Sequence, residues 1–226
     1  MVGYLTEMVL ENRPVLCIGG GQVALRKLTG LLACGPRITV VAPTVHPQVA
    51  AWAQGGRITH RAAPFAPGDL DAPPSPVLVF AATGQAALNR EIARQAALRG
   101  LLCNSADDPL GSGFLVPAVV RRGPVVVGVG TAGLSPALAR LLKDRLEVWL
   151  EPGWEGLVQL FGALRERVKQ TIPNPLQRQH FWRETAQAVA RERRFEHSDN
   201  GPWLEARLLQ ADGPGTSEPG DTRDSR

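Results

Sequence analysis

The stretch Pro14-Val-Leu-Cys-Ile-Gly-Gly-Gly-Gln-Val-Ala24 decides the fold of this chain of 226 residues. Residues 15–18 are apolar without alternation, which is typical of a strand buried on both faces of a parallel sheet. Gly19, Gly21 and Ala24 then occupy the three small positions of the G-x-G-x-x-G/A pattern, where the strand turns into a helix. The pattern predicts a dinucleotide site at Gly19 and Gly21. A tight turn that binds nothing is the alternative.

Strands and helices alternate through the first half of the chain. Further β-branched or apolar runs predict strands at 37–42, 58–61, 77–82 and 101–104. Helical patterns lie between them, at 24–34, 47–54 and 85–99. Five prolines in residues 64–76 predict a loop without regular structure. The alternation predicts an α/β fold, a Rossmann-like doubly wound parallel sheet with right-handed crossovers.

The pattern changes near Pro109. Two short apolar runs at 114–120 and 125–129 predict an antiparallel hairpin rather than another crossover. Ser135 and Pro136 are suited to the N-cap and first position of a helix that continues to about residue 149. Amphipathic helices are expected at 154–171 and 175–194. From residue 197 the composition predicts a disordered tail, except for one helical turn at 203–209.

The composition is that of a globular protein, with 44% hydrophobic and 20% charged residues. No apolar run is long enough to span a bilayer, and residues 1–12 lack the basic start of a signal peptide. We therefore expect a cytoplasmic protein without a membrane partner. The three cysteines have no C-x-x-C spacing, which indicates reduced thiols. The four histidines fit no ligand spacing, so no metal site is predicted.

Positive charge is concentrated before residue 197. The last 30 residues carry six acids against three arginines, although the whole chain has a net charge of +4. Few aromatic residues accompany the cations, which argues against a nucleic-acid partner and favours an anionic small molecule. The helices predicted at 154–171 and 175–194 carry many of these cations: Arg165, Arg167, Lys169, Arg178, Arg183, Arg191, Arg193 and Arg194. For any single one of them, an ordinary solvated helix face is the better interpretation.

The carboxyl ends of parallel strands form the ligand crevice of such a fold. Two strand ends besides the glycine turn reach it, at residues 82–84 and 104–109, so Thr83 and Asn104 are candidate cofactor contacts. Asp107 and Asp108 end the second segment and offer a carboxylate as general acid or base. Alternatively, both acids form the turn before Pro109.

The second predicted strand ends Val40-Val-Ala-Pro-Thr44, without the acid that often holds the ribose hydroxyls. Thr44 and backbone groups would have to replace it. No arginine follows this strand directly, so no pocket for a 2′-phosphate is apparent. The sequence therefore favours NAD over NADP.

Four segments resemble precorrin-2 dehydrogenases, which form the N-terminal half of sirohaem synthases. Residues 19–27 read G-G-G-Q-V-A-L-R-K, and residues 103–109 read C-N-S-A-D-D-P, as in the family's C-N-x-x-D-x-P. Residues 114–118 read F-L-V-P-A, and residues 131–140 resemble S-x-G-x-S-P-x-L-A-R with Thr131 in the first position. The resemblance covers about residues 1–195. Four linked motifs are far more specific than the glycine turn alone.

The resemblance implies NAD-dependent dehydrogenation of precorrin-2 to sirohydrochlorin, a step of sirohaem biosynthesis. Some members are also ferrochelatases (lyases) that insert ferrous iron into this tetrapyrrole. The family's catalytic aspartate corresponds to Asp107 and not to Asp108, and we expect Asp107 to serve both reactions. The dinucleotide contacts that the resemblance implies are Gln22, Val23, Pro43 and Thr44.

The family's fold also implies the domain organisation. We expect an NAD-binding domain at 1–112, a small α+β dimerisation region at 113–150, a helical substrate-binding domain at 151–196 and the tail at 197–226. A homodimer follows from this resemblance. The methyltransferase domain of bifunctional members is missing, so a separate uroporphyrinogen methyltransferase is expected to supply precorrin-2.

Two other interpretations remain open. The chain could be a non-catalytic module that senses NAD(H) and regulates a partner, but this leaves residues 104–109 and the basic helices unexplained. It could also be a dehydrogenase of another anionic metabolite. Turnover of precorrin-2 separates the family's activity from both.

Overall fold

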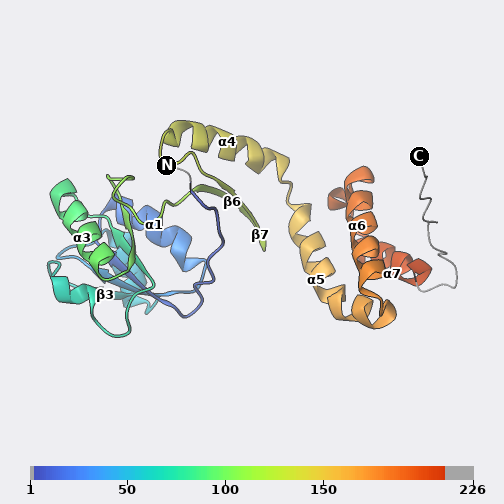
Figure 1. Cartoon of the computed structure of the whole chain (residues 1–226), viewed down its shortest axis with the longest axis horizontal. Helices are drawn as coiled ribbons and strands as arrows, with labels where there is room; N and C mark the ends of the chain where they lie inside the picture. Colours follow the sequence, from blue (N-terminus) through green and yellow to red (C-terminus); the bar gives the residue numbers. More distant parts are fainter. Residues whose placement is uncertain (1–2, 212–226) are drawn as a thin grey trace, which may run out of the picture. The chain divides into compact units, whose positions relative to one another are not determined.

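The computed structural model describes residues 3–211, which divide into two compact units. The first, here called the sheet unit, contains the chain up to Ala118 together with Gly130–Ala139. The second, the helical unit, contains Val119–Val129 and the chain from Arg140 onward. Figure 1 shows the elements of both along the chain.

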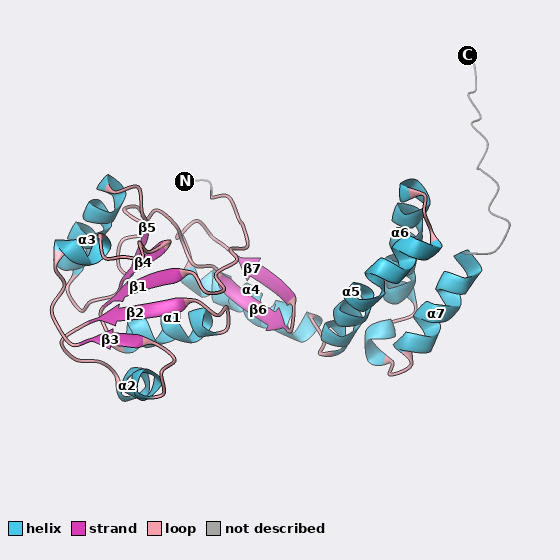
Figure 2. Ribbon diagram, turned by 90° about the horizontal axis from the view of Figure 1, so that it is seen from below, coloured by secondary structure: helices cyan, strands magenta, loops and turns pink. Residues whose placement is uncertain are grey.

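The sheet unit is built on five parallel strands in the order β3-β2-β1-β4-β5 (Figure 2). This order, with β1 central and the chain reversing direction across the sheet after β3, confirms the predicted doubly wound fold. The strands are β1 (Pro14–Ile18), β2 (Arg37–Val41), β3 (Thr59–Arg61), β4 (Leu78–Ala81) and β5 (Leu102–Ser105).

The register brings the carboxyl ends of the central strands to one edge. Ile18 of β1 pairs with Val41 of β2 and with Ala81 of β4. Backbone hydrogen bonds continue one residue beyond the strands, because Gly19 N donates to the Val41 carbonyl at 2.9 Å and Ala82 N to the Ile18 carbonyl at 2.8 Å. The turns after β1, β2 and β4 therefore start level with one another.

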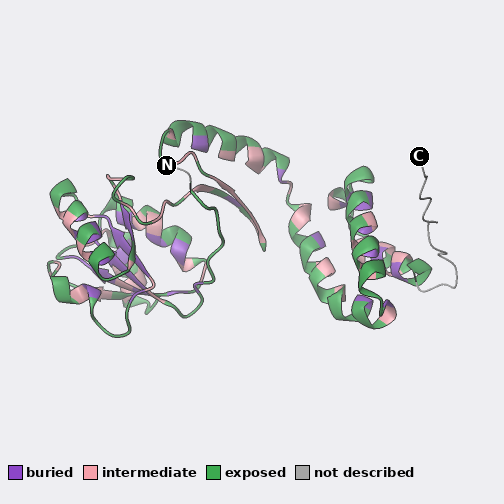
Figure 3. Ribbon diagram, viewed as in Figure 1, coloured by how far each residue is buried: buried purple, intermediate pink, exposed green. Residues whose placement is uncertain are grey.

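Helices cover both faces of this sheet. Helices α1 (Gln22–Leu32) and α2 (Pro47–Gln54) pack on one face, and α3 (Ala86–Leu98) packs on the other. The alternate side chains of β1 divide between the two cores: Cys17 lies in the first and Ile18 in the second. Figure 3 shows the strands as the most buried part of this unit, which explains their apolar sequences.

One loop is more ordered than its prolines predict. Residues 67–70, expected to be irregular, form a short 3₁₀ helix, η1 (Pro67–Leu70). Proline is tolerated at the start of a helix, and the Asp69 carboxylate accepts the Ala66 N–H at 2.8 Å. Leu70 is only 1% exposed in the core beneath α3, and this burial fixes the turn.

The predicted hairpin and the helix after it are present. Strands β6 (Ala118–Arg122) and β7 (Val125–Val129) form a separate sheet, joined by Gly123 and Pro124. A connection of two residues makes the pair antiparallel. Helix α4 (Pro136–Trp149) begins as predicted, because the Ser135 hydroxyl accepts the Leu138 N–H at 3.3 Å.

Three helices make up most of the helical unit: α5 (Gly153–Thr171), α6 (Pro175–Arg191) and α7 (Asn200–Ala211), with η2 (Arg194–Glu196) between the last two. Helix α7 corrects the expected tail, in which only residues 203–209 were predicted to be helical. Leu204 and Leu208 lie one turn apart and are buried, which stabilises the helix. The rest of the predicted tail, residues 212–226, lies outside the described residues.

Within residues 3–211, every helix is too short or too polar to cross a membrane.

Candidate functional site

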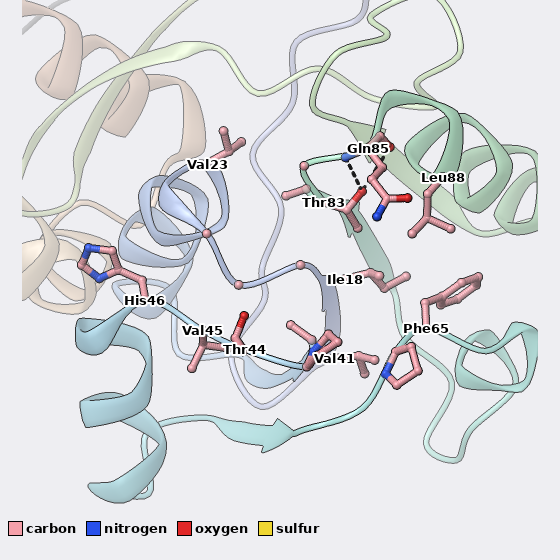
Figure 4. A pocket seen from close by; sticks show the side chains of 18 of the residues that line it. Ile18, Val23, Val41, Thr44, Val45, His46, Phe65, Thr83, Gln85 and Leu88 are labelled. Atoms are coloured by element: carbon pink, nitrogen blue, oxygen red, sulfur yellow. Dashed lines mark hydrogen bonds between the residues drawn. The ribbon is translucent and has the colours of Figure 1, made fainter.

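A pocket of about 690 Å³ opens at the carboxyl edge of the five-stranded sheet (Figure 4). This volume is in the range of small-molecule and cofactor sites. The pocket brings together seven of the eight residues predicted to contact a dinucleotide: Gly19, Gly21, Gln22, Val23, Pro43, Thr44 and Thr83. The eighth, Asn104, does not line it.

Each glycine of the turn after β1 is required for a different reason. Gly19 has a φ of +106°, and a Cβ there would lie 2.2 Å from the Ala82 carbonyl oxygen. A Cβ on Gly20 would lie 2.4 Å from a methyl group of Val45. A Cβ on Gly21 would meet no atom within 4 Å, because this residue borders the open pocket. Packing therefore requires the first two, whereas Gly21 leaves room for a ligand.

The start of α1 suits a phosphate. Gly21 is its N-cap residue and has no side chain to satisfy the first N–H groups, and no acid stands in the first turn. Such N–H groups and the positive end of the helix dipole favour an anion. Gln22 and Val23 provide the first of these N–H groups, and both residues line the pocket.

The rest of the pocket is uncharged. No Asp, Glu, Lys or Arg is among its lining residues, all of which belong to the described part of the chain. Thr44 lies at the end of β2 where a ribose-binding acid often stands, and its hydroxyl is the polar group available there (Figure 4). Neighbouring His46 caps α2, because its Nδ1 accepts the Gln48 N–H at 3.1 Å.

These features fit a dinucleotide. The helix N-terminus and the space beside Gly21 suit the pyrophosphate, and the apolar walls, including Val23 and Leu88, suit flat rings. The absence of Lys and Arg from the walls fits NAD better than NADP, whose extra phosphate needs a cation.

A buried amide joins this pocket to Asp107. Asn89 of α3 is 0% exposed, and its Oδ1 accepts hydrogen bonds from Thr83 N at 3.0 Å and Thr83 Oγ1 at 2.7 Å. Its Nδ2 donates to the Thr83 carbonyl at 3.1 Å. The same Nδ2 lies 3.0 and 2.9 Å from the two carboxylate oxygens of Asp107. Asp107 itself is exposed, so its carboxylate is held by Asn89 and remains accessible to solvent.

Asp108 has a different role from its neighbour. Its Oδ1 accepts the Gly111 N–H at 2.9 Å, and its carbonyl accepts the Ser112 hydroxyl at 2.8 Å. Asp108 is thus a turn former, whereas the alternative interpretation expected both acids to form the turn. Asp107 takes no part in these turn contacts and is the better candidate for chemistry.

Asn104 lies on β5 and binds the interior of the sheet unit instead of the pocket wall. Its Oδ1 accepts from Lys27 Nζ at 2.5 Å, and its Nδ2 donates to the Phe114 carbonyl at 2.9 Å. Burial, followed by the charge of Arg26, lowers the pKa of the Lys27 ammonium, and Asp107 is among the charges that oppose this shift. The predicted cofactor contact of Asn104 stays a prediction.

Two cysteines lie in the cores on either side of the sheet. Burial raises the pKa of the Cys17 thiol to about 12 and that of the Cys103 thiol to about 11. All three thiols of the chain, including that of Cys34, are free. Among residues 3–211, no group of three or more His, Cys, Asp or Glu residues is placed to hold a metal ion.

The helical unit has a hollow of its own, of about 440 Å³, between α5 and α6. We call it the basic hollow, and it is lined by Arg165, Glu166, Lys169, Arg178 and Trp182. Arg178 is anchored there, because its Nη1 donates to the Ile172 carbonyl at 2.8 Å. Three other cations of the predicted set bind acids instead: Arg167 pairs with Glu205, Arg193 with Glu151 and Glu196, and Arg194 with Asp199.

Two family models match the chain. Residues 8–118 match a putative NAD(P)-binding domain, which confirms the predicted dinucleotide cofactor. Residues 153–199 match the sirohaem synthase dimerisation region. The matched residues form the helices α5 and α6, whereas the resemblance implied a dimerisation region at residues 113–150.

The chain is similar to curated sirohaem synthases. It is 42% identical to siroheme synthase 2 of Aeromonas salmonicida over 173 residues. This aligned segment covers 76% of this chain and 35% of that protein. It is 40% identical over 182 residues to the siroheme synthase of Methylobacillus flagellatus, covering 80% and 38%. The chain thus spans little more than a third of the length of these relatives.

A solved structure shares the fold. The precorrin-2 dehydrogenase SirC superposes with a TM-score of 0.74 at 22% identity, covering 92% of this chain and 100% of that one.

The sequence pattern missed three residues that complete this region. Asn89 lies in a helix whose sequence gives no signal for a polar bridge. Gly20 stands at a variable position of the G-x-G-x-x-G pattern, so only its contact with Val45 explains it. Lys27 belongs to the quoted G-G-G-Q-V-A-L-R-K motif, and that motif was the available signal.

Proposed function

We propose that this chain, which resembles sirohaem synthases over 76–80% of its length, belongs to the precorrin-2 dehydrogenase and sirohaem synthase family and oxidises precorrin-2 to sirohydrochlorin with NAD. One observation of the structure carries the proposal. The exposed residue Asp107 accepts hydrogen bonds from the buried amide of Asn89, and this amide is also bonded to Thr83 in the wall of the dinucleotide pocket.

The chain's own residues bind the cofactor and handle the proton. In this proposal the N–H groups of Gln22 and Val23 bind the pyrophosphate, and Thr44 contacts a ribose hydroxyl. NAD, when bound, accepts the hydride that the tetrapyrrole loses. Asp107 takes the proton that leaves with it, as an accessible carboxylate can.

The basic hollow suits the carboxylates of the tetrapyrrole. Precorrin-2 is a polycarboxylate, and Arg165, Lys169 and Arg178 outnumber the one acid of the hollow, Glu166. Among residues 3–211, Arg165 forms no ion pair, so its guanidinium is available to a ligand carboxylate. Lys169 Nζ lies 3.9 Å from Glu166 Oε2, and Arg178 is held by the Ile172 carbonyl. We therefore assign substrate binding first to Arg165, with Lys169 and Arg178 beside it, rather than to Arg167, Arg193 or Arg194.

The remaining expectations belong to the same proposal. A homodimer is supported by the match of residues 153–199 to a dimerisation region. Ferrous iron is proposed as a second substrate, because the relatives named sirohaem synthase form an iron-containing tetrapyrrole. The domain boundaries implied by the resemblance and a cytoplasmic location are also proposed.

Anaerobic incubation with NAD and enzymatically generated precorrin-2 tests the function. Formation of the sirohydrochlorin spectrum together with one equivalent of NADH is the expected result. Addition of ferrous iron should then give the sirohaem spectrum faster than in the protein-free control. NAD binding without turnover would overturn the proposal and favour the NAD(H)-sensing module. NADH formation with a different anionic metabolite alone would favour the other dehydrogenase interpretation.

A further inference from the structure

Among residues 3–211, Asn89 is the one buried polar side chain that contacts both Thr83 of the pocket wall and the proposed catalytic carboxylate. It lies in the first turns of α3, on the side of the sheet opposite α1. We infer that Asn89 is a positioning residue, which sets the orientation of Asp107 relative to the bound cofactor. The inference rests on the proposed role of Asp107.

The hydrogen bonds leave the Asn89 amide a single orientation. Thr83 N can only donate, so the group that faces it must be the Asn89 oxygen, at 3.0 Å. An ionised carboxylate can only accept, so the group that faces Asp107 must be the Asn89 NH₂, at 2.9 and 3.0 Å. A rotated amide would lose both sets of contacts. Because the residue is 0% exposed, water cannot replace them.

The contacts join three segments that the sequence keeps apart. Thr83 follows β4, Asn89 belongs to α3 and Asp107 follows β5. The Thr83 hydroxyl also accepts the Gln85 N–H at 3.2 Å, which fixes the start of α3. Thr83 and Gln85 both line the dinucleotide pocket. A ligand that contacts Thr83 or Gln85 is therefore linked to the Asp107 carboxylate through the hydrogen bonds of Asn89.

The charged side chains near Asp107, those of Asp108 and Lys27, do not hold its carboxylate in place. Asp108 is engaged in the turn to Gly111, and the ammonium of Lys27 is bound by Asn104. Among the described residues, the side-chain hydrogen bonds of Asp107 are those from Asn89. The orientation of the carboxylate thus depends on one amide.

Asn89→Asp tests the inference with a change of one side-chain group. The new carboxylate still accepts from Thr83 N and Oγ1, but in its ionised form it no longer donates to Asp107 or to the Thr83 carbonyl. We expect kcat for precorrin-2 to fall about 10²-fold, the loss typical of a misplaced catalytic group, while the Kd for NAD stays within about threefold. A loss in kcat with an equal loss in kcat/KM is the signature of an interaction made in the transition state.

The matched control is Asn174→Asp. Asn174 caps α6, where its Oδ1 accepts the Leu176 N–H at 2.9 Å, and an aspartate can accept the same bond. This control has the same change of charge in the helical unit and should keep both kcat and the Kd for NAD. Circular dichroism gives the folded fraction of each variant, to which the rates are referred.

Asn89→Ser decides the matter if Asn89→Asp does not fold. Serine is neutral, and its hydroxyl has one hydrogen, so it cannot serve Thr83 and Asp107 as the amide does. A folded variant with normal kcat would overturn the inference, and so would a loss of kcat that only accompanies an equal loss of NAD affinity. Failure of the proposed function looks different, because the unsubstituted protein would then not turn over precorrin-2 at all.

Discussion

Two hollows among the described residues, one in each unit, are built from different groups of the polypeptide. The dinucleotide pocket, of about 690 Å³, is lined by glycines, apolar side chains and strand-end backbone. The basic hollow, of about 440 Å³, is lined by four charged side chains and an indole. Backbone geometry determines the first, whereas the ends of long side chains determine the second.

This difference predicts how each site responds to change. A site made of backbone cannot lose its N–H groups by substitution, but it fails when a side chain is added where none fits. A site made of exposed Arg and Lys loses one contact at a time, and salt screens what remains. We expect catalysis and cofactor binding to depend strongly on a few positions of the sheet unit. Substrate binding should depend weakly on each of several positions of the helical unit.

The largest expected effect concerns Asp107. Replacement of Asp107 by Asn removes the proposed proton acceptor and should lower kcat for precorrin-2 by about 10²–10⁴-fold, the usual range for a general acid or base. Anaerobic turnover followed by NADH absorbance measures it. Asp108→Asn, which changes only the acid of the turn to Gly111, should keep most of the activity. The reverse ranking of the two variants would move the chemistry to Asp108.

The glycine turn gives the next effect. Gly19→Ala puts a Cβ against the Ala82 carbonyl at a positive φ and should destabilise the fold by about 3 kcal/mol or more. Gly21→Ala meets open space, so its free energy of unfolding should stay near that of the parent protein. Its Kd for NAD should nevertheless rise about tenfold, or about 1.4 kcal/mol. Urea unfolding and NAD titration measure the two quantities.

Two outcomes would contradict the separate roles of Gly19 in packing and Gly21 in NAD binding. If Gly21→Ala were as unstable as Gly19→Ala, the space beside Gly21 would be required by packing. If it bound NAD normally, the pyrophosphate would lie elsewhere.

Thiol labelling separates the two units. Cys17 and Cys103 lie in the cores of the sheet unit, and burial raises the pKa of their thiols to about 12 and about 11. At pH 8 they should therefore react only when this unit opens. NAD at 100 times its Kd should raise the free energy of this opening by about 2.7 kcal/mol. The labelling of Cys17 and Cys103 should slow accordingly. Cys34, which is partly exposed, should react in the folded protein and serve as the internal control.

Tryptophan fluorescence provides the comparison within the same sample. Four of the five tryptophans, Trp149, Trp154, Trp182 and Trp203, belong to the helical unit. Their unfolding transition in urea should shift less with NAD than the thiol protection does. An equal shift would mean that both units unfold together.

The smallest expected effect belongs to the basic hollow. Arg165→Gln should raise the Kd for the tetrapyrrole by about two- to fivefold, as expected for one exposed ionic contact. The salt dependence of binding should decrease with it, and the Kd for NAD should stay the same. Arg167→Gln is the matched control, because Arg167 pairs with Glu205. Quenching of fluorescence at two salt concentrations measures both, and equal effects of the two variants would remove the special role of the hollow.

Much of the fold could be predicted because its signals are local. The uninterrupted apolar run of β1, the β-branched run of β2 and the alternation with helices predict a parallel sheet without reference to distant residues. Helix α7 was predicted only in part, at 203–209, because the Gly- and Asp-rich residues after 211 dominate the composition there, although Leu204 and Leu208 have helical spacing. The helical turn η1 was missed because prolines outweighed the burial of Leu70.

The sequence by itself determined the order of the elements, the glycine turn and the candidate Asp107, because each depends on neighbours along the chain. The tertiary structure decided which polar groups meet. Asn89 reaches Asp107 across 18 residues, and Lys27 reaches Asn104 across 77. It also distinguished Arg165, in the hollow, from Arg194, which is buried and pairs with the exposed Asp199. The physical reason is that hydrogen bonds and ion pairs form between segments that only sheet register and helix packing bring together.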